Sequence, residues 1–387
     1  MCVLGVIVPV YNTADFLECC LMSIRNQSMD NMRIVIVNDG STDDSGNIAD
    51  EFASITPYTK VVHQENQGVL SAIKRGIKEL DSEYVTIVDS DDWIAPETYN
   101  SLESYMDERF DIIDFPMVRY VSNKKCYVSA NGRKKGIYDK RSIFDKLVGT
   151  MIWDIETKEH GLNPSLCNKL IKKDLFDECI EKVPMLSGNY GQDMVILYPM
   201  IKKVESFVFA ETGKYIHRLR NSGIAPYIID KKFYRNLLEI YEFLCDSFDN
   251  DPVIVKQLDF HFYETAQLHL KLYGFTQDKN NELFLFPFQM IPRASKIILY
   301  GAGRIGNEYY KQILSTGYCQ VLAWVDRYKT ISENGSSIQC PESLLTIDYD
   351  YIVVAVYEEK MANEIIQFLE MMGVSSNKIV WSIFRVK

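Results

Sequence analysis

The chain has 387 residues, of which 47% are apolar, and its formal net charge at pH 7 is −11. This length is enough to bury two hydrophobic cores, and the acidic balance argues against nucleic acid as a partner. Nine cysteines without metal-ligand spacing favour reduced thiols in a cytoplasmic protein. The apolar start, residues 1–10, has no basic leader or cleavage site, so it predicts a strand and not a signal peptide.

Four strand–helix units are predicted within about the first ninety residues. Residues 6–12 and 34–45 are apolar runs that end in polar turns, and residues 60–68 form a third strand followed by a helical pattern over 69–80. An open parallel sheet binds its ligands at the carboxyl ends of its strands. The polar residues that follow these strands are therefore expected to lie together around a ligand.

The fourth strand, residues 85–93, ends abruptly in Asp89, Asp91 and Asp92. Carboxylates this close repel one another unless a cation or protons neutralise them, and short Asp side chains suit one divalent ion bound to a diphosphate. The pattern indicates a metal–nucleotide site with Asp89 and Asp91 as ligands. The alternative is an ordinary strand followed by a helix that Asp92 caps.

The middle of the chain is less distinctive. Asp193 lies at the start of an amphipathic pattern, where an N-capping residue is the simplest interpretation. Residues 231–248 and 253–272 repeat apolar and aromatic positions with helical spacing. Such aromatic stripes favour a helical connector, spanning 226–294, over a platform for binding sugars.

A second α/β unit begins at Ser295. It contains a strand, the pattern Gly-x-Gly-x-x-Gly at residues 301–306, a helix and a further strand that ends in Asp326. These are the parts of a dinucleotide-binding fingerprint and predict a small Rossmann-like domain over 295–387. The unit is too short for a dehydrogenase with its own substrate domain and has no Tyr-x-x-x-Lys pair. We therefore favour a structural role, including homo-oligomer assembly, over binding of NAD or a nucleotide.

Four motifs occur in a specific order and spacing: Val-Pro-Val-Tyr-Asn at 8–12, Asn-Asp-Gly-Ser-Thr-Asp-Asp-Ser at 38–45, Asn-Gln-Gly at 66–68 and Asp-Ser-Asp-Asp at 89–92. Together they resemble the family 2 glycosyltransferases of the GT-A fold. The resemblance implies a metal, Mg2+ or Mn2+, at Asp89 and Asp91 beside the diphosphate. It also implies donor-binding roles for a wider set of residues, namely Pro9, Tyr11, Asn12, Asp39, Asn66, Lys74, Asp89 and Ser90. Lys74 or Arg75 stands in for the arginine of the family's Ala-Arg-Asn segment.

The same resemblance implies roles on the acceptor side. The family usually has Glu-Asp at the position of Gln192-Asp193, so Asp193 is expected to be the general base. Residues 164–176 resemble the segment that leads to the acceptor, with Cys167 where an aromatic residue is common. Residues 215–223 resemble the loop that closes over the diphosphate. His217 in this loop is a candidate ligand for the metal or a phosphate, and the alternative is an ordinary surface histidine.

The predicted architecture is thus a GT-A nucleotide-sugar-binding domain (1–225), a helical connector (226–294) and a Rossmann-like domain (295–387). The predicted activity is inverting, metal-dependent transfer of a sugar from a nucleotide diphosphate, foremost a UDP-sugar, to a hydroxyl of a glycan, wall-polymer or lipid-linked acceptor. The alternatives are a nucleotide-sugar oxidoreductase or epimerase, and a non-catalytic scaffold for polysaccharide assembly. No apolar run reaches the ~20 residues of a membrane-spanning helix, so any association with the inner face of the membrane would be peripheral.

Overall fold

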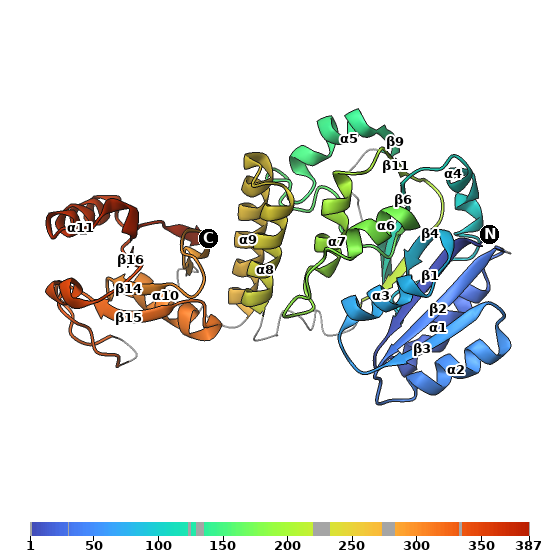
Figure 1. Cartoon of the computed structure of the whole chain (residues 1–387), viewed down its shortest axis with the longest axis horizontal. Helices are drawn as coiled ribbons and strands as arrows, with labels where there is room; N and C mark the ends of the chain where they lie inside the picture. The colour runs from blue at the N-terminus through green and yellow to red at the C-terminus, as the bar shows by residue number, and fades with distance from the viewer. Residues whose placement is uncertain are drawn as a thin grey trace. The chain divides into compact units, whose positions relative to one another are not determined.

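The structure is a computed structural model that describes residues 2–29, 31–122, 125–128, 135–219, 233–272, 283–332 and 335–386. Its contacts divide the chain into two compact units. The first comprises Met1–Tyr227 and Asn236–Phe262, and the second comprises Ile228–Arg235 and Tyr263–Lys387. Figure 1 shows the elements of each unit along the chain.

An eight-stranded mixed sheet forms the centre of the first unit, with the order β3-β2-β1-β4-β10-β6-β11-β9. The bounds are β1 Cys2–Val10, β2 Met32–Asp39, β3 Thr59–Gln64, β4 Ser82–Ile87, β6 Ile112–Asp114, β9 Gly136–Asp139, β10 Lys169–Lys172 and β11 Ser206–Phe209. Strands β3, β2, β1 and β4 are parallel, and Val10 pairs with Asn38 while Asp39 pairs with Gln64. This register places the polar ends of the first three strands at one edge of the sheet, as the sequence predicts.

The helices of the first unit follow the predicted apolar pattern. They are α1 Ala14–Arg25, α2 Ser45–Ile55, α3 Val69–Lys78, α4 Glu103–Asp107, α5 Lys140–Lys146, α6 Lys173–Ile180 and α7 Gln192–Ile201, with 3-10 turns at Asn100–Leu102 and Val148–Thr150. In α3 the buried face carries Leu70, Ile73 and Ile77. Gly76 of the same helix lies so close to Ile7 that an added Cβ would be 2.6 Å from its Cγ2. The helix can therefore pack directly on β1.

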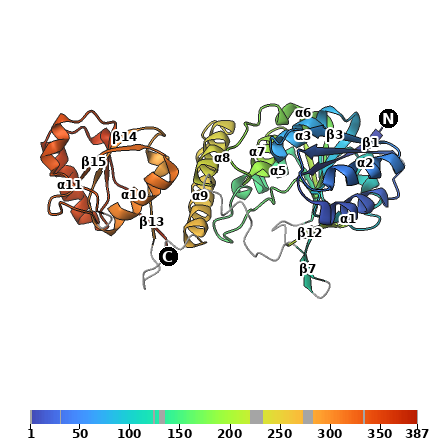
Figure 2. The ribbon, with the colours of Figure 1, turned by 90° about the horizontal axis from the view of Figure 1, so that it is seen from below.

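A smaller sheet lies beside the acidic end of β4. Its order is β5-β12-β7-β8, with β5 Trp93–Ile94, β7 Met117–Ser122, β8 Lys125–Val128 and β12 Tyr215–Arg218. Strands β12 and β7 lie side by side in Figure 2. Because β5 begins directly after Asp92, the alternative of a helix capped by Asp92 is wrong. The acidic residues instead occupy a short turn between two strands.

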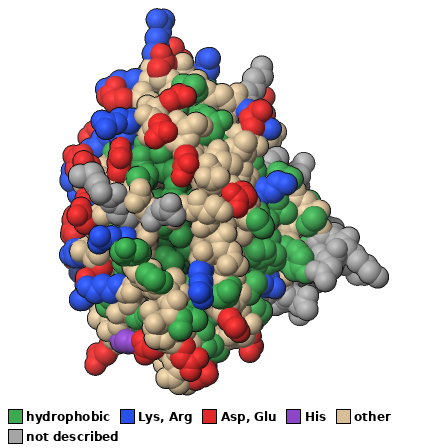
Figure 3. Space-filling model, turned by 90° about the vertical axis from the view of Figure 1, so that its right-hand side faces the viewer, with side chains coloured by type: hydrophobic (Ala, Val, Ile, Leu, Met, Phe, Trp, Pro, Cys, Tyr) green, Lys and Arg blue, Asp and Glu red, His purple; other side chains and the backbone are tan. Residues whose placement is uncertain are grey.

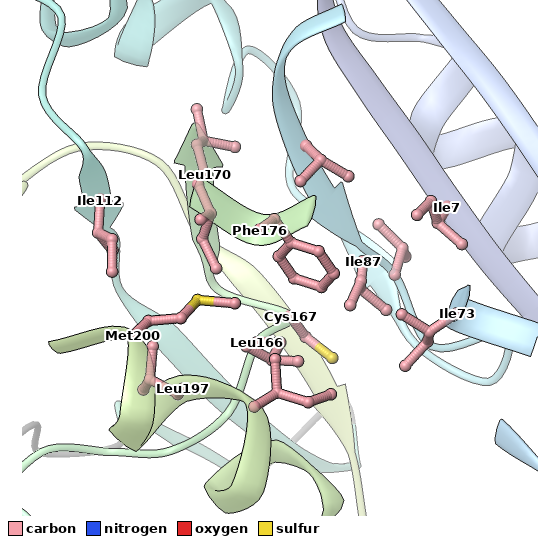
Figure 4. Close-up of a cluster of buried hydrophobic side chains, with 14 of the residues drawn as sticks. Ile7, Ile73, Ile87, Ile112, Leu166, Cys167, Leu170, Phe176, Leu197 and Met200 are labelled. Carbon is pink, nitrogen blue, oxygen red and sulfur yellow. The ribbon is translucent and has the colours of Figure 1, made fainter. Parts of the chain in front are cut away.

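The core under this turn is continuous and apolar. Figure 4 shows side chains from the central strands and from α3, α6 and α7 packed against one another, including Ile7, Ile73, Ile87, Ile112, Leu166, Leu170, Phe176, Leu197 and Met200. Cys167 is buried in the same cluster. Burying these side chains supplies the main favourable free energy for this part of the fold, at roughly 1.5–3 kcal/mol for each large aliphatic or aromatic residue.

Two long helices follow, α8 Phe233–Ser247 and α9 Pro252–Leu272, close to the predicted spans 231–248 and 253–272. The parts of α8 and α9 from Asn236 to Phe262 belong to the first unit by their contacts. The two helices pack against each other through Tyr241, whose hydroxyl donates to Asp259 Oδ1 at 2.8 Å and whose ring meets Phe262 edge-on.

The second unit contains a four-stranded parallel sheet, ordered β15-β14-β16-β17. Its elements are β13 Leu283–Leu285, β14 Lys296–Tyr300, α10 Arg304–Thr316, β15 Gln320–Val325, β16 Tyr351–Val354, α11 Glu359–Met371, β17 Ile379–Val380 and β18 Phe384–Val386, with 3-10 turns at Phe288–Met290, Pro341–Thr346 and Ser376–Lys378. The predicted strand, glycine-rich turn, helix and second strand are therefore present in that order.

The surface carries charges of both signs. On the face of the molecule in Figure 3, basic and acidic side chains are intermixed, with hydrophobic side chains scattered between them. Among the described helices, none combines the length and the apolar character needed to cross a membrane. The expected peripheral association and the expected assembly through the second unit stay predictions.

Candidate functional site

A cavity of about 470 Å³ opens at the carboxyl ends of β1, β2 and β4. Most of the predicted donor-binding residues line it, and the complete lining is Pro9, Val10, Tyr11, Asp39, Asn66, Gly68, Val69, Ala72, Asp89, Ser90, Asp91 and Asn189. Apolar walls with a few carboxylates are typical of a binding site for a small ligand that carries polar groups. Residues from the four motifs thus meet at one place.

Asp39 fixes one wall of this cavity. Its Oδ1 accepts hydrogen bonds from the Gln67 N–H at 2.9 Å and from Gln64 Nε2 at 2.8 Å, and its Oδ2 accepts the Gly68 N–H at 2.8 Å. The next residue, Gly40, has a positive φ of 71°, and an added Cβ would lie 2.8 Å from the Asn66 nitrogen. Glycine is therefore needed where these two loops meet.

Asn12 connects the loops after β1 and β2. Its side-chain Oδ1 accepts the Thr42 N–H at 2.8 Å, and its own N–H donates to Ser41 Oγ at 3.1 Å. Asn12 and Lys74 are not among the residues that line the cavity. The Lys74 ammonium donates to the Val183 carbonyl oxygen at 2.8 Å. Direct contact of either side chain with a donor stays a prediction.

Residues of β12 bind the acidic turn, residues 89–92, through hydrogen bonds. The Tyr215 hydroxyl donates to Asp92 Oδ2 at 2.7 Å and accepts the Asp89 N–H at 3.1 Å. Arg218 donates its N–H to Asp92 Oδ1 at 2.7 Å and its Nε–H to the Asp91 carbonyl oxygen at 2.9 Å. The Arg218 guanidinium also lies 4.6 Å from the centre of the Trp93 ring. These contacts fix the backbone of the turn, so Asp92 points to β12 while Asp89 and Asp91 line the cavity.

Negative charge in this turn is destabilised by burial. Burial raises the pKa of Asp89 to about 6, with the Cys167 thiol opposing the rise and the charge of Asp91 adding to it. Burial also raises the pKa of Asp92 to about 8, and the charges of Asp89 and Asp91 contribute. A cation at the turn would stabilise the ionised carboxyl groups.

The protein ligands for such a cation are few. Among the described residues, no group of three or more His, Cys, Asp and Glu side chains is arranged to hold a metal. Mg2+, however, is often bound by one or two carboxylates together with substrate phosphates. Asp89 and Asp91 at the cavity wall fit that arrangement. His217 on β12 interacts electrostatically with Asp91, and its buried Nδ1 has no hydrogen-bond partner among the described residues.

Asp193 lies in the first turn of α7, whose N-cap is Gly191. The prediction that Asp193 itself caps the helix is therefore wrong. Its carboxylate accepts the Leu166 N–H. Burial, followed by the charge of Asp89, raises the pKa of Asp193 to about 7, while the Leu166 N–H and the Lys169 ammonium oppose the rise. A carboxylate with this pKa is matched to accepting a proton near neutral pH.

Two neighbours of the site carried no clear signal in the sequence. Asn189 lines the cavity although it belongs to the loop before α7. Its position four residues before Asp193, in a turn rich in Asn and Gly, is the only available hint. Cys167 donates its thiol to Asp89 Oδ2 at 3.1 Å. In the sequence, Cys167 is marked only as the residue at a position where an aromatic ring is common in the family it resembles.

The predicted loop over the diphosphate is partly described. Tyr215 to Leu219 are placed, and Arg220 to Gly223 lie outside the described residues. The described part includes the residues of β12 that hold the acidic turn. Closure of the remaining residues over a donor stays a prediction.

The glycine fingerprint of the second unit lines a separate cavity of about 410 Å³. A Cβ on Gly306 would overlap the carbonyl oxygen of Gly301, so this glycine allows α10 to approach β14. Asp326 Oδ2 accepts the Ala302 N–H at 2.7 Å, and Oδ1 accepts the N–H groups of Tyr328 and Lys329 at 2.8 and 3.0 Å. The Asp326 carboxylate, the acidic residue of the predicted fingerprint, thus accepts backbone N–H groups of the adjacent loops. Binding of a nucleotide here stays untested.

Comparison with known proteins gives two family matches. The profile of the family described as glycosyl transferase family 2 matches residues 5–178. The profile described as C2185-like, N-terminal, matches residues 293–380. The first match contains all four N-terminal motifs, and the second contains the glycine fingerprint.

Three relatives are similar to part of the chain. The putative glycosyltransferase EpsH of Bacillus subtilis is 42% identical over 245 residues, which cover 62% of this chain and 67% of EpsH. Glycosyltransferase GlyG of Streptococcus pneumoniae is 30% identical and covers 62% of this chain and 78% of its own length. Glycosyltransferase GlyA of the same species is 32% identical over 57% of this chain, but the match spans only 31% of GlyA.

Among solved structures, the fold is similar to residues 1–349 of TarS from S. aureus in complex with UDP-GlcNAc. The TM-score is 0.51 at 19% sequence identity, and the match covers 72% of this chain and 77% of the TarS chain. At this identity the similarity establishes the fold alone. That fold is the GT-A arrangement, built here on a large sheet rich in parallel strands.

Proposed function

The chain belongs to glycosyl transferase family 2, and we propose that it transfers a sugar from a nucleoside diphosphate donor to a hydroxyl of a glycan, wall-polymer or lipid-linked acceptor. The observation that carries this proposal is a single cavity bordered by Asp89 and Asp91, with the half-buried carboxyl of Asp193 in electrostatic contact with Asp89. Asp89 and Asp91 suit a divalent ion bound to a diphosphate, and Asp193 suits a reacting hydroxyl. A UDP-sugar is the donor we expect.

The donor half of the site follows from the strand ends. Pro9, Tyr11, Asp39 and Asn66 border the part of the cavity formed by the first three loops, and Tyr11 is 49% exposed and free to meet a planar base. Asp89 and Asp91 border the part where the diphosphate would lie. A divalent ion bound there would neutralise the charge that develops on the leaving diphosphate.

The transfer step is a displacement with inversion at the anomeric carbon. Asp193 takes the proton of the acceptor hydroxyl, and the oxygen forms a bond to the anomeric carbon. The bond between that carbon and the diphosphate oxygen breaks, and its electron pair leaves with the nucleoside diphosphate. Lys169, fully buried and paired with Asp114 at 2.8 Å, lies close enough to Asp193 to favour its ionised form before the proton arrives.

Donor binding is tested with Asp91→Ala. Thermal unfolding of the parent is measured with UDP, UDP-glucose and UDP-GlcNAc in the presence of Mg2+ or Mn2+. Ligand at a hundredfold above Kd should stabilise the parent by about 2.7 kcal/mol, and the variant should lose the metal-dependent part. Asp246→Asn, an exposed position on α8, is the control that should behave like the parent. Equal metal-dependent stabilisation in Asp91→Ala would refute the proposed ligand set.

The base is tested with Asp193→Asn, which keeps the shape of the side chain. UDP binding should stay at the parental level, while release of UDP during transfer should fall on the order of a hundredfold or more, because the acceptor proton has no recipient. Transfer at the parental rate would show that another group is the base.

A further inference from the structure

The loop that leads to Asp193 is held by α8, a helix that the sequence assigns to the connector. Asn236 on this helix is fully buried. Its Oδ1 accepts the Gly188 N–H at 3.2 Å, and its Nδ2 donates to the Tyr190 carbonyl oxygen at 2.7 Å. The Asn236 amide therefore binds the backbone of the residues on both sides of Asn189, and Asn189 itself lines the donor cavity.

The next turn of α8 continues the contact. Glu239 accepts the Ser187 N–H at 2.7 Å and also binds the Ser187 hydroxyl. Ile240 packs against Gly191, where an added Cβ would lie 2.5 Å from Ile240 Cδ1. Because Asn236, Glu239 and Ile240 are three and four residues apart, they present one face of the helix to the loop.

Helix α9 adds a further contact. The Tyr190 hydroxyl and His261 Nε2 are 2.9 Å apart, and the two rings are stacked. The loop 187–191 is thus bound through its backbone at three residues and through the Tyr190 ring. It ends at the N-cap of α7, two residues before Asp193. Any displacement of the loop would move both Asn189 and the start of α7.

We propose that Asn236 and Glu239 are positioning residues that hold Asn189 and Asp193 in the geometry needed for sugar transfer. The proposal rests on the proposed function and extends the catalytic unit beyond residue 225, into α8. The Asn236 amide and the Glu239 carboxylate each accept a loop N–H, and a loop N–H without its partner is costly, so loss of either side chain should release the loop. Their effect on turnover should exceed their effect on nucleotide binding, because Pro9 and Asp39 lie at the ends of β1 and β2 and Asp91 lies in the turn after β4.

The test uses full-length variants Asn236→Ala, Glu239→Ala and Glu239→Gln, with Asp246→Asn as a matched control on an exposed part of α8. Binding of UDP with Mg2+ is measured by titration calorimetry, and UDP release from a UDP-sugar gives kcat and KM. Both alanine variants should lose at least tenfold in kcat with the Kd for UDP within twofold of the parent. Glu239→Gln keeps an acceptor for the Ser187 N–H, so it should retain most of the parental kcat.

Hydrogen exchange separates this proposal from the proposed function. Amides of residues 187–193 should exchange at least tenfold faster in the alanine variants, and those of residues 34–39 should not change. Unchanged exchange in 187–193 would overturn the positioning role, whatever the activity of the parent. Parental kcat in both alanine variants, or an equal loss of UDP affinity and kcat, would also overturn it. A parent that transfers no sugar would instead count against the proposed function.

Discussion

Replacing Tyr215 by Phe removes one hydroxyl from the support of the acidic turn. Tyr215 is fully buried, and its hydroxyl is shared between the Asp92 carboxylate at 2.7 Å and the Asp89 N–H at 3.1 Å. Phenylalanine has the same ring and should fill the same space. The substitution therefore tests the two hydrogen bonds with little change in packing.

The expected loss of stability follows from the groups left behind. Asp92 is 1% exposed, so its Oδ2 would lose a partner in a place that water reaches poorly. A buried polar group without its partner costs about 1–3 kcal/mol, and the Asp89 N–H adds a second such group. We expect Tyr215→Phe to lower the free energy of unfolding by about 3 kcal/mol. In a unit of this size that corresponds to a fall in Tm of roughly 6–12 °C.

The assay is urea unfolding followed by tryptophan fluorescence, with scanning calorimetry to assign the transition of the first unit. Tyr127→Phe is the matched control, because Tyr127 is 46% exposed and the same hydroxyl is lost to solvent. The control should change the free energy of unfolding by less than about 0.5 kcal/mol. If Tyr215→Phe were equally neutral, the hydroxyl would not support the turn and the argument would fail.

Two further outcomes are expected. Gly306→Ala should lower the free energy of unfolding of the second unit by at least about 2 kcal/mol in calorimetry, because its Cβ would overlap the Gly301 carbonyl oxygen. Gly303→Ala is the control and should have little effect, because no atom lies within 4 Å of an added Cβ there. Burial lowers the pKa of His160 to about 4, below the ~6.5 of an unfolded chain, so the unfolded state binds more protons as pH falls. The contribution of neutral His160 to the free energy of unfolding should therefore be complete above pH ~6.5 and fall by about 3 kcal/mol as the pH decreases toward 4. Urea titrations of His160→Gln over this pH range should show a smaller decrease in the free energy of unfolding.

The N-terminal half of the fold could be predicted well from local patterns. The apolar strands, the polar residues that end them and the helical periodicity each depend on a few neighbouring residues. Parallel pairing then brings the strand ends to one edge, so the sequence could predict that Pro9, Asp39 and Asp89 border one cavity. The same reasoning gave the strands and helices of the second unit.

The sequence determined which residues end the strands, whereas the tertiary structure decided which partners hold them in place. Tyr215 and Asp92 are 123 residues apart, and Gly188 and Asn236 are 48 apart, so no local pattern marks either hydrogen bond. Lys74 donates to the Val183 carbonyl, 109 residues away, and Asp326 accepts the Ala302 N–H, and no local pattern marks either partner. Buried polar side chains bind whichever partner the packed chain brings within about 3 Å, because a buried polar group without a partner lowers the stability of the fold. That choice is made only when distant segments pack together.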